Sequence, residues 1–218
     1  MKKLICILSL VFFCSINQSK AQLPASLSDI KWTETKHNGF LIANDGMKTE
    51  VVFDVDVRMH IGAVEKGEVN YSVKGSSAVV TSIGDEYKGF QIGEKIFERI
   101  AFVKAKVPRK VRFMRVVAKG KIDAYEYIHH TSIEIGDDGK AKEGNFYYVS
   151  IFLRNNDTKV EVIANEGAGI AKAVELMKDN EAVMGDYKFR QYDVLETKEG
   201  VVKRVDLLKM VNDYNAAK

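Results

Sequence analysis

The chain has 218 residues, of which 33 are basic and 30 acidic. The first 21 residues hold three of the basic ones (Lys2, Lys3 and Lys20) and no acid, so the rest of the chain is balanced at 30 against 30. This balance gives no reason to expect a nucleic-acid partner. Both cysteines, Cys6 and Cys14, lie in the same stretch. After its removal the chain would have no disulfides and no cysteine metal site.

Residues 1–21 are predicted to be a signal peptide. A positive start precedes an apolar run over Leu4–Phe13, and Ser19-Lys20-Ala21 has the small residues of a cleavage site. The run is too short to span a bilayer, and the bulky residue before Cys14 does not fit a lipoprotein signal. We expect an exported protein that begins at Gln22 and is periplasmic, outer-membrane-associated or secreted. No transmembrane segment is expected in the mature chain.

The next residues are predicted to form a lead-in segment (22–38) and one α+β domain (39–218). Gly39–Ala43 is a short apolar strand, and Asn44-Asp45-Gly46 is a strong signal for a hairpin turn. Apolar and polar residues then alternate over 50–60, which predicts a strand with one buried face.

Short apolar segments separated by turn residues continue to residue 163, and this spacing favours an antiparallel meander. About ten strands in one sheet must curl or split into two layers. The further strands are predicted at 69–74, 77–83, 95–103, 110–118, 121–129, 131–135, 145–153 and 160–163.

The apolar period becomes helical over 168–216. One helix is predicted around Ile170, Ala173 and Met177, and a closing helix is predicted to begin at Val201. The stripe facing the sheet would be Val201, Val205, Leu208 and Val211. The predicted fold is therefore α+β: an antiparallel, strongly curled or two-layer meander of about ten strands, with C-terminal helices packed on it.

Several short motifs resemble those of a family of exported Bacteroidota proteins of unassigned function. Gly39–Gly46 resembles its opening strand, G-[YF]-[IL]-[IV]-x-x-[ED]-G, although Met47-Lys48 replaces the Asp-Thr that often follows. Lys88-Gly89-Phe90 resembles its K-G-F strand, Tyr125-Glu126-Tyr127 its Y-x-Y pair, and Tyr214-Asn215 the end of its closing helix. The resemblance implies an envelope location and a strand-rich domain, and it transfers no catalytic residues.

The candidate binding site is a basic stretch, residues 99–121, which holds nine cations and no acid. Its local field could attract an anionic envelope component, such as a lipid headgroup or an acidic glycan, or another envelope protein. Alternatively, acids on neighbouring strands neutralise it, and its lysines discourage edge-to-edge pairing. Nearby tyrosines could stack on sugar rings or pack in the core. The candidate residues are Arg109, Lys110, Arg112, Arg115, Lys119, Lys121, Tyr125 and Tyr127.

Other polar residues give weaker signals for chemistry. Asp54 and Asp56 share a strand face with Glu50 and could serve as an acid/base pair or hold Ca²⁺, but the solvated face of a half-buried strand explains them without any site. His129 and His130 would point to opposite faces of a strand and so could not chelate one ion. The chain contains no nucleophile-elbow, zinc-protease or phosphate-loop motif.

We therefore predict no catalytic residues, no metal and no cofactor. The predicted function is a non-catalytic binding or assembly component of the cell envelope. The alternatives are a small-ligand or lipid carrier with an interior cavity, and a hydrolase that uses Asp54 and Asp56. An interior pocket would favour the carrier, and carboxylates at the floor of a cleft would favour the enzyme.

Overall fold

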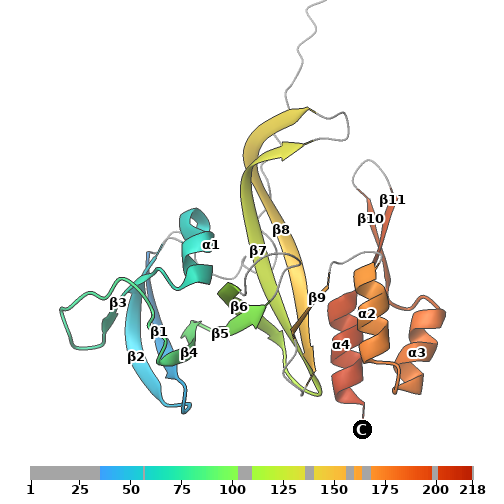
Figure 1. Ribbon diagram of the computed structural model, residues 1–218, viewed down its shortest axis with the longest axis horizontal. Coiled ribbons are helices and arrows are strands. Elements are labelled where there is room, and N and C mark those ends of the chain that lie inside the picture. Colours follow the sequence, from blue (N-terminus) through green and yellow to red (C-terminus); the bar gives the residue numbers. More distant parts are fainter. Residues whose placement is uncertain are drawn as a thin grey trace, which may run out of the picture.

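The computed structural model describes residues 35–55, 57–102, 110–135, 140–155, 160–163, 168–197 and 201–217. The predicted signal peptide lies outside these residues. In chain order the elements are β1 (Lys36–Ala43), β2 (Lys48–Asp54), α1 (Val57–Lys66), β3 (Asn70–Val73), β4 (Tyr87–Ile92), β5 (Lys95–Phe102), β6 (Lys110–Ala118), β7 (Ile122–Ile135), β8 (Ala141–Asn155), β9 (Val160–Ile163), α2 (Ala168–Leu176), α3 (Glu181–Lys188), β10 (Asp193–Thr197), β11 (Val201–Val205) and α4 (Leu207–Ala216) (Figure 1).

One antiparallel sheet contains nine of the described strands, in the order β3-β2-β1-β4-β5-β6-β7-β8-β9. The sheet is open, with β3 and β9 at its two edges, and β10 and β11 form a separate hairpin. β5 also contacts β9, although three strands separate them in the sheet. Helices α2 and α4 pack at the β9 end of the sheet (Figure 1). The predicted antiparallel α+β fold is confirmed.

The predicted first strand and turn are also confirmed. Asp45 accepts a hydrogen bond from the Met47 N–H at 2.9 Å, and Gly46 has a φ of 93°, a left-handed conformation that glycine adopts without strain. At Gly39 a Cβ atom would lie 2.0 Å from the carbonyl oxygen of Gln91. The motif glycine of β1 therefore allows β1 and β4 to approach closely.

The strand predicted over 50–60 is wrong beyond Asp54, because α1 begins at Val57. The apolar residues there satisfy two periods, since Val57, Ile61 and Val64 also have the i, i+4, i+7 spacing of a helix. Val64 is buried among the residues of the sheet core, so tertiary packing selects the helix. The strand predicted at 77–83 is reduced to a single bridge between Tyr71 and Val80.

The closing helix also begins later than predicted. Val201–Val205 is β11, paired with β10, and α4 starts after Asp206, whose side chain accepts from the Lys209 N–H at 2.9 Å. A β-branched segment with an adjacent partner strand forms a hairpin, and the aspartate then caps a helix. The buried face of α4 consists of Leu207, Met210, Val211 and Tyr214.

Three groups of buried apolar side chains stabilise the fold. The first lies between α1 and strands β1–β6 and includes a stacked pair, Phe90 and Phe97, with ring centroids 4.7 Å apart. The second joins the C-terminal helices to β7 and β8 and includes Ala124, Leu153, Met177, Met210 and Val211. The third lies on the other face of the sheet and consists of Ile100, Met114, Tyr125 and Phe152.

Tyr214 and Asn215, the motif that ends the closing helix, anchor α4 to the turn between β6 and β7. The Asn215 side chain accepts from the Ile122 N–H at 2.9 Å and donates to the Ile122 carbonyl at 2.8 Å. A Cβ atom at Gly120 would lie 2.5 Å from the Asn215 side chain, so this contact requires glycine. The Tyr214 hydroxyl donates to Asp179 at 3.0 Å.

Asn215→Ala should therefore lower the free energy of unfolding by about 1–3 kcal/mol, because both backbone groups of Ile122 lose their side-chain partner. Asn212→Ala is the matched control on the exposed side of the same helix, with an expected change within about 0.5 kcal/mol. Urea denaturation of both variants gives the comparison. Equal midpoints would show that Asn215 does not hold α4 in place.

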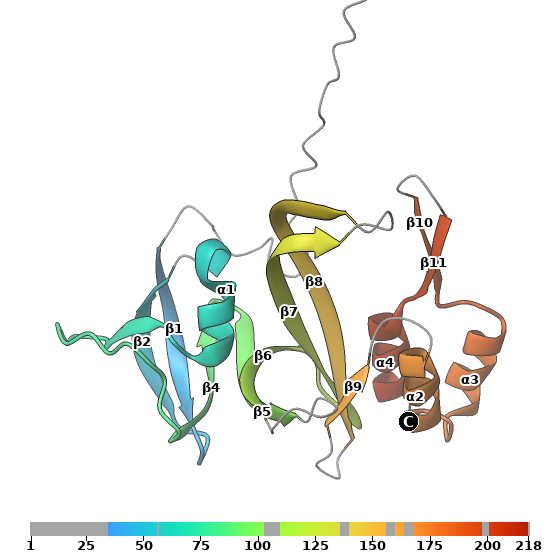
Figure 2. The same cartoon turned by 45° about the horizontal axis from the view of Figure 1, so that its top comes forward.

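β7 and β8 extend well beyond the rest of the sheet (Figures 1 and 2). They pair from Ile122↔Asn155 to Ile135↔Ala141, whereas β6 pairs with β7 only as far as Glu126. β9 pairs with β8 only over Ile151–Arg154. Within the described residues, Tyr127–Ile135 and Ala141–Ser150 therefore form a two-stranded projection, which we call the distal ribbon.

Candidate functional site

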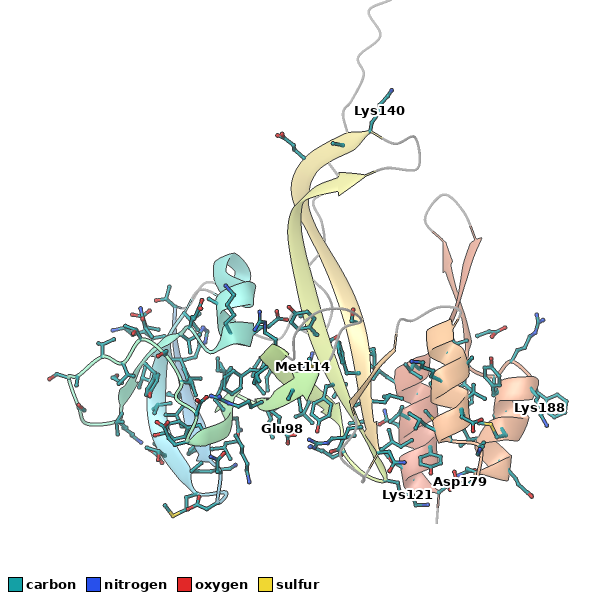
Figure 3. All side chains as sticks on the ribbon, viewed as in Figure 1. Glu98, Met114, Lys121, Lys140, Asp179 and Lys188 are labelled. Atoms are coloured by element: carbon teal, nitrogen blue, oxygen red, sulfur yellow. The ribbon has the colours of Figure 1, made fainter. Side chains whose placement is uncertain are left out.

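Among the side chains that the structure describes, the largest group of interacting polar residues lies where β5, β7 and β8 meet the turn after β6. We call it the Tyr125 cluster, and Figure 3 labels one member, Glu98, near the middle of the molecule. Lys119 contacts Glu98 at 2.7 Å and Asp123 at 3.2 Å, and Arg154 contacts Asp123 at 2.7 Å and Glu98 at 3.4 Å. The cluster consists of Glu98, Lys119, Asp123, Tyr125 and Arg154.

Tyr125 is the centre of this cluster. Its ring is fully buried, and its hydroxyl lies 2.9 Å from Glu98 and 3.1 Å from Asp123. Lys119 and Arg154 also lie over the ring, 5.1 and 5.0 Å from its centroid. One aromatic side chain thus contacts two carboxylates and two cations, which combines hydrogen bonds with cation–π contacts.

The pKa shifts indicate which protonation states these groups hold. Burial, followed by the negative charge of Glu98, raises the pKa of the Tyr125 hydroxyl far above its ordinary value. Burial alone would raise the pKa of Asp123, but hydrogen bonds from Arg154 and Lys119 lower it below the ordinary value. Tyr125 therefore stays a neutral donor and Asp123 an ionised acceptor near neutral pH.

The chemistry that this arrangement supports is cross-linking of the sheet. Its two cations and two carboxylates balance, and the only hydroxyl is held in its protonated form. General acid–base catalysis requires a group that titrates near the working pH and reaches a substrate. The pKa shifts of Asp123 and Tyr125 lead away from neutral pH, so Asp123 stays ionised and Tyr125 stays protonated.

The basic stretch supplies Lys119 to this cluster, and its other described cations also contact partners within the chain. Arg115 forms an ion pair with Glu126 at 3.2 Å, and Lys121 donates to the Ala217 carbonyl at 3.0 Å. Arg99 pairs with Asp85 and donates to the Gly84 carbonyl at 2.6 Å.

The candidate residues also fail to share one face. Arg112 donates to the Val111 carbonyl at 2.8 Å and lies three positions from Arg115, so the two point to opposite sides of β6. Tyr125 is in the core, as the packing interpretation predicts, and Tyr127 packs against the same group. Arg109 lies outside the described residues, as does the side chain of Lys110.

Sequence reasoning missed Glu65, a buried carboxyl group on α1. Its side chain is 5% exposed and accepts a hydrogen bond from the Ile128 N–H at 2.7 Å. β6 no longer pairs with β7 at that point, so the acid supplies an acceptor that the sheet does not. Burial raises the pKa of Glu65 to about 8. The hydrogen bond from Ile128, the charge of Arg112 and a hydrogen bond with the Tyr127 hydroxyl lower this pKa, but they offset only part of the effect of burial. The sequence signal that could have indicated Glu65 is its position next to Val64, in a segment whose apolar residues have helical spacing.

The alternative acid pair receives less support from the structure. Asp54 is exposed at the end of β2, and Asp56 lies outside the described residues. Among the side chains that the structure describes, no three His, Cys, Asp or Glu residues are grouped so that they could hold a metal ion. His129 and His130 belong to β7, but their side chains are not among those described.

Comparison of the chain with protein-family models, curated proteins and solved structures finds no match. The resemblance to exported Bacteroidota proteins therefore stays a prediction based on short motifs. In the described part of the chain, no helix has the length and apolar character needed to cross a membrane.

Proposed function

We propose that this protein is an exported, non-catalytic binding or assembly component of the cell envelope that engages its partner through the distal ribbon. The observation that carries the proposal is the extent of this projection. β7 and β8 continue together for eight residue pairs past Glu126, from Tyr127↔Ser150 to Ile135↔Ala141. Strands that leave a sheet present unpaired backbone groups, which is how proteins add a strand from a partner.

The polar clusters support a binding role over an enzymatic one. In the Tyr125 cluster the charged groups contact one another, and Glu65 contacts the backbone of β7. Side chains committed to bonds within the fold stabilise it and are not directed at a substrate. The contact between β5 and β9 also supports the strong curl that we propose for this part of the sheet.

The basic stretch supports an anionic partner less well than the distal ribbon supports a protein partner. Arg99, Arg115 and Lys119 are all in ion pairs. Exposed cations attract an anion through their uncompensated field, and neighbouring carboxylates reduce that field. A partner held by backbone pairing to the distal ribbon does not depend on these charges.

The proposal predicts that the distal ribbon is required for capture of an envelope partner. The test variant replaces residues 129–148 with Asn-Gly, which closes the hairpin after the Ile128↔Val149 pair with a favoured two-residue turn. Tagged wild type, crosslinked in its own envelope and purified, should capture a partner that the shortened variant does not. The shortened variant should keep a cooperative thermal transition, because the three buried groups remain.

The matched control shortens the other projecting hairpin, β10–β11, and should still capture the partner. Capture by all three proteins would contradict the proposal. A second outcome would also contradict it: the shortened ribbon variant still captures the partner, but loses it when Arg112 and Lys119 are reversed to glutamate. The basic stretch would then be the docking site.

A further inference from the structure

The outer edge of β8 is the longest unpaired strand edge in the described structure. β9 covers β8 only at Ile151–Arg154, so among the described residues no strand pairs with the outer side of Ala141–Ser150. Ten residues of extended strand present an edge of about 34 Å. Figures 1 and 2 show this part of β8 standing beside β7 and clear of the helices and of the remaining strands.

The opposite edge of the distal ribbon is partly occupied. α1 contacts β7 where β7 separates from β6, and Glu65 takes the Ile128 N–H. A strand added on that side would have to displace the helix and this hydrogen bond. The edge of β8 therefore offers the easier place for a new strand.

The composition of the β8 edge is unusual for an unprotected strand. Exposed edges normally carry lysines, prolines or inward-pointing charges that prevent pairing with another chain. Asn145–Ser150 contains no charge and no proline, and the nearest charges before it in the chain, Lys140, Lys142 and Glu143, sum to a single positive charge. Beyond residue 21 the whole chain is balanced, so net repulsion between copies would be small.

A second copy of the chain matches this edge by symmetry. A twofold axis at Phe146 would place Phe146 opposite Phe146 of the partner subunit and would lay the two copies of Ala141–Ser150 side by side. Aromatic residues pair favourably with one another across antiparallel strands. The result is a four-stranded sheet, β7-β8-β8-β7, and a sheet of that size is stable where an isolated two-stranded ribbon is marginal.

We propose that this protein forms a twofold dimer by antiparallel pairing of the β8 edges over Ala141–Ser150. The dimer rests on the proposed function, since it names the partner of the distal ribbon. It is an isologous interface, the commonest kind in soluble homo-oligomers. The other possible occupant, an extended strand from a different protein, is an outcome of the test below.

The test measures the mass of the full chain by sedimentation across a wide range of concentrations, with hydrogen exchange at the two extremes. The apparent mass should rise from that of one chain to that of two. Amide protection within Ala141–Ser150 should increase with it, while the amides of β1 and β2 should exchange equally at both concentrations.

Proline substitution locates the pairing, because proline lacks the N–H that an added strand would accept. Neighbouring residues of a strand direct their N–H groups to opposite edges, so of Tyr147→Pro and Tyr148→Pro one removes an outward N–H and the other a bond to β7. The outward variant should stay monomeric at every concentration while keeping the wild-type circular dichroism spectrum. Tyr147→Ala and Tyr148→Ala lose the same side chains but keep the N–H, and both should still dimerise.

A monomer at all concentrations would overturn the dimer, as would a dimer whose protected amides lie outside β8. If the protein is monomeric but the distal ribbon is still needed for envelope capture, the dimer fails and the proposed function stands, with a strand of another protein at this edge. If the protein dimerises through β8 but shortening the ribbon leaves envelope capture intact, the dimer stands and the proposed envelope role of the ribbon fails.

Discussion

Replacing Glu65 by glutamine should remove a large part of the pH dependence of stability. A glutamate in the unfolded chain ionises near its ordinary pKa of 4.5, whereas burial raises the pKa of Glu65 in the folded protein to about 8. Between these values the folded protein binds more protons than the unfolded chain does. The free energy of unfolding therefore falls as the pH rises. The stabilisation is fully present below the unfolded pKa and is lost as the pH passes the folded one.

The expected size follows from the same two values. Each pH unit inside the window costs about 1.4 kcal/mol, so the wild type should lose roughly 4–5 kcal/mol between pH 4.5 and pH 8 through this group. Glutamine can still accept from the Ile128 N–H, and it is uncharged at every pH. The variant should match the wild type within about 1 kcal/mol near pH 5 and be the more stable protein at pH 8.

Urea denaturation of both proteins from pH 5 to pH 9 gives this difference directly, because every other group titrates in both. Glu68→Gln is the control, since Glu68 is a neighbouring, largely exposed carboxylate in a surface pair with Lys66. The free energy of unfolding of Glu68→Gln should change with pH in the same way as that of the wild type. Parallel curves for Glu65→Gln as well would show that Glu65 ionises normally, with Arg112 compensating its charge.

Arg115→Ala should lower the free energy of unfolding by about 3–5 kcal/mol with no ligand present. The Arg115 side chain is 16% exposed and that of Glu126 is 7% exposed, and they are partners across β6 and β7. Removing the guanidinium leaves a buried carboxylate without its counter-charge, and the desolvation of that carboxylate is no longer offset. Urea or thermal denaturation at pH 7 measures the loss.

Two controls separate burial from charge. Replacing both partners, Arg115→Met with Glu126→Leu, removes both buried charges and should restore most of the lost stability. Glu68→Ala breaks the exposed pair with Lys66 and should cost less than about 1 kcal/mol. A small loss for Arg115→Ala would instead identify Arg115 as a solvated cation that is free to act as part of a binding surface.

Features that depend on nearby residues could be predicted from the sequence. The turn at Asn44-Asp45-Gly46, the strand before it and the helix around Ala173 each need only a local pattern. Where one pattern allowed two structures, the prediction was wrong. Val57 and Val201 each begin a segment that fits both periods, and the result is a helix in the first case and a strand in the second.

Contacts between distant positions could not be predicted in the same way. Arg154 and Asp123 are 31 positions apart, Glu65 and Ile128 are 63 apart, and Asn215 and Ile122 are 93 apart. No periodicity links such pairs, because the fold alone brings them together. For the same reason the sequence left open whether the basic stretch is uncompensated or neutralised by acids on neighbouring strands, and the structure partners Arg115 with Glu126 from the neighbouring strand.

The sequence by itself determined the antiparallel α+β class, the main strand and turn positions and the balance of charge, because each follows from composition or from the short-range geometry of the backbone. Only the tertiary structure decided which charges are neutralised, where Glu65 is buried and how far β7 and β8 extend beyond their neighbours. These properties depend on which strands and helices lie side by side, and that arrangement sets both the desolvation of a buried group and the pairing of a strand edge.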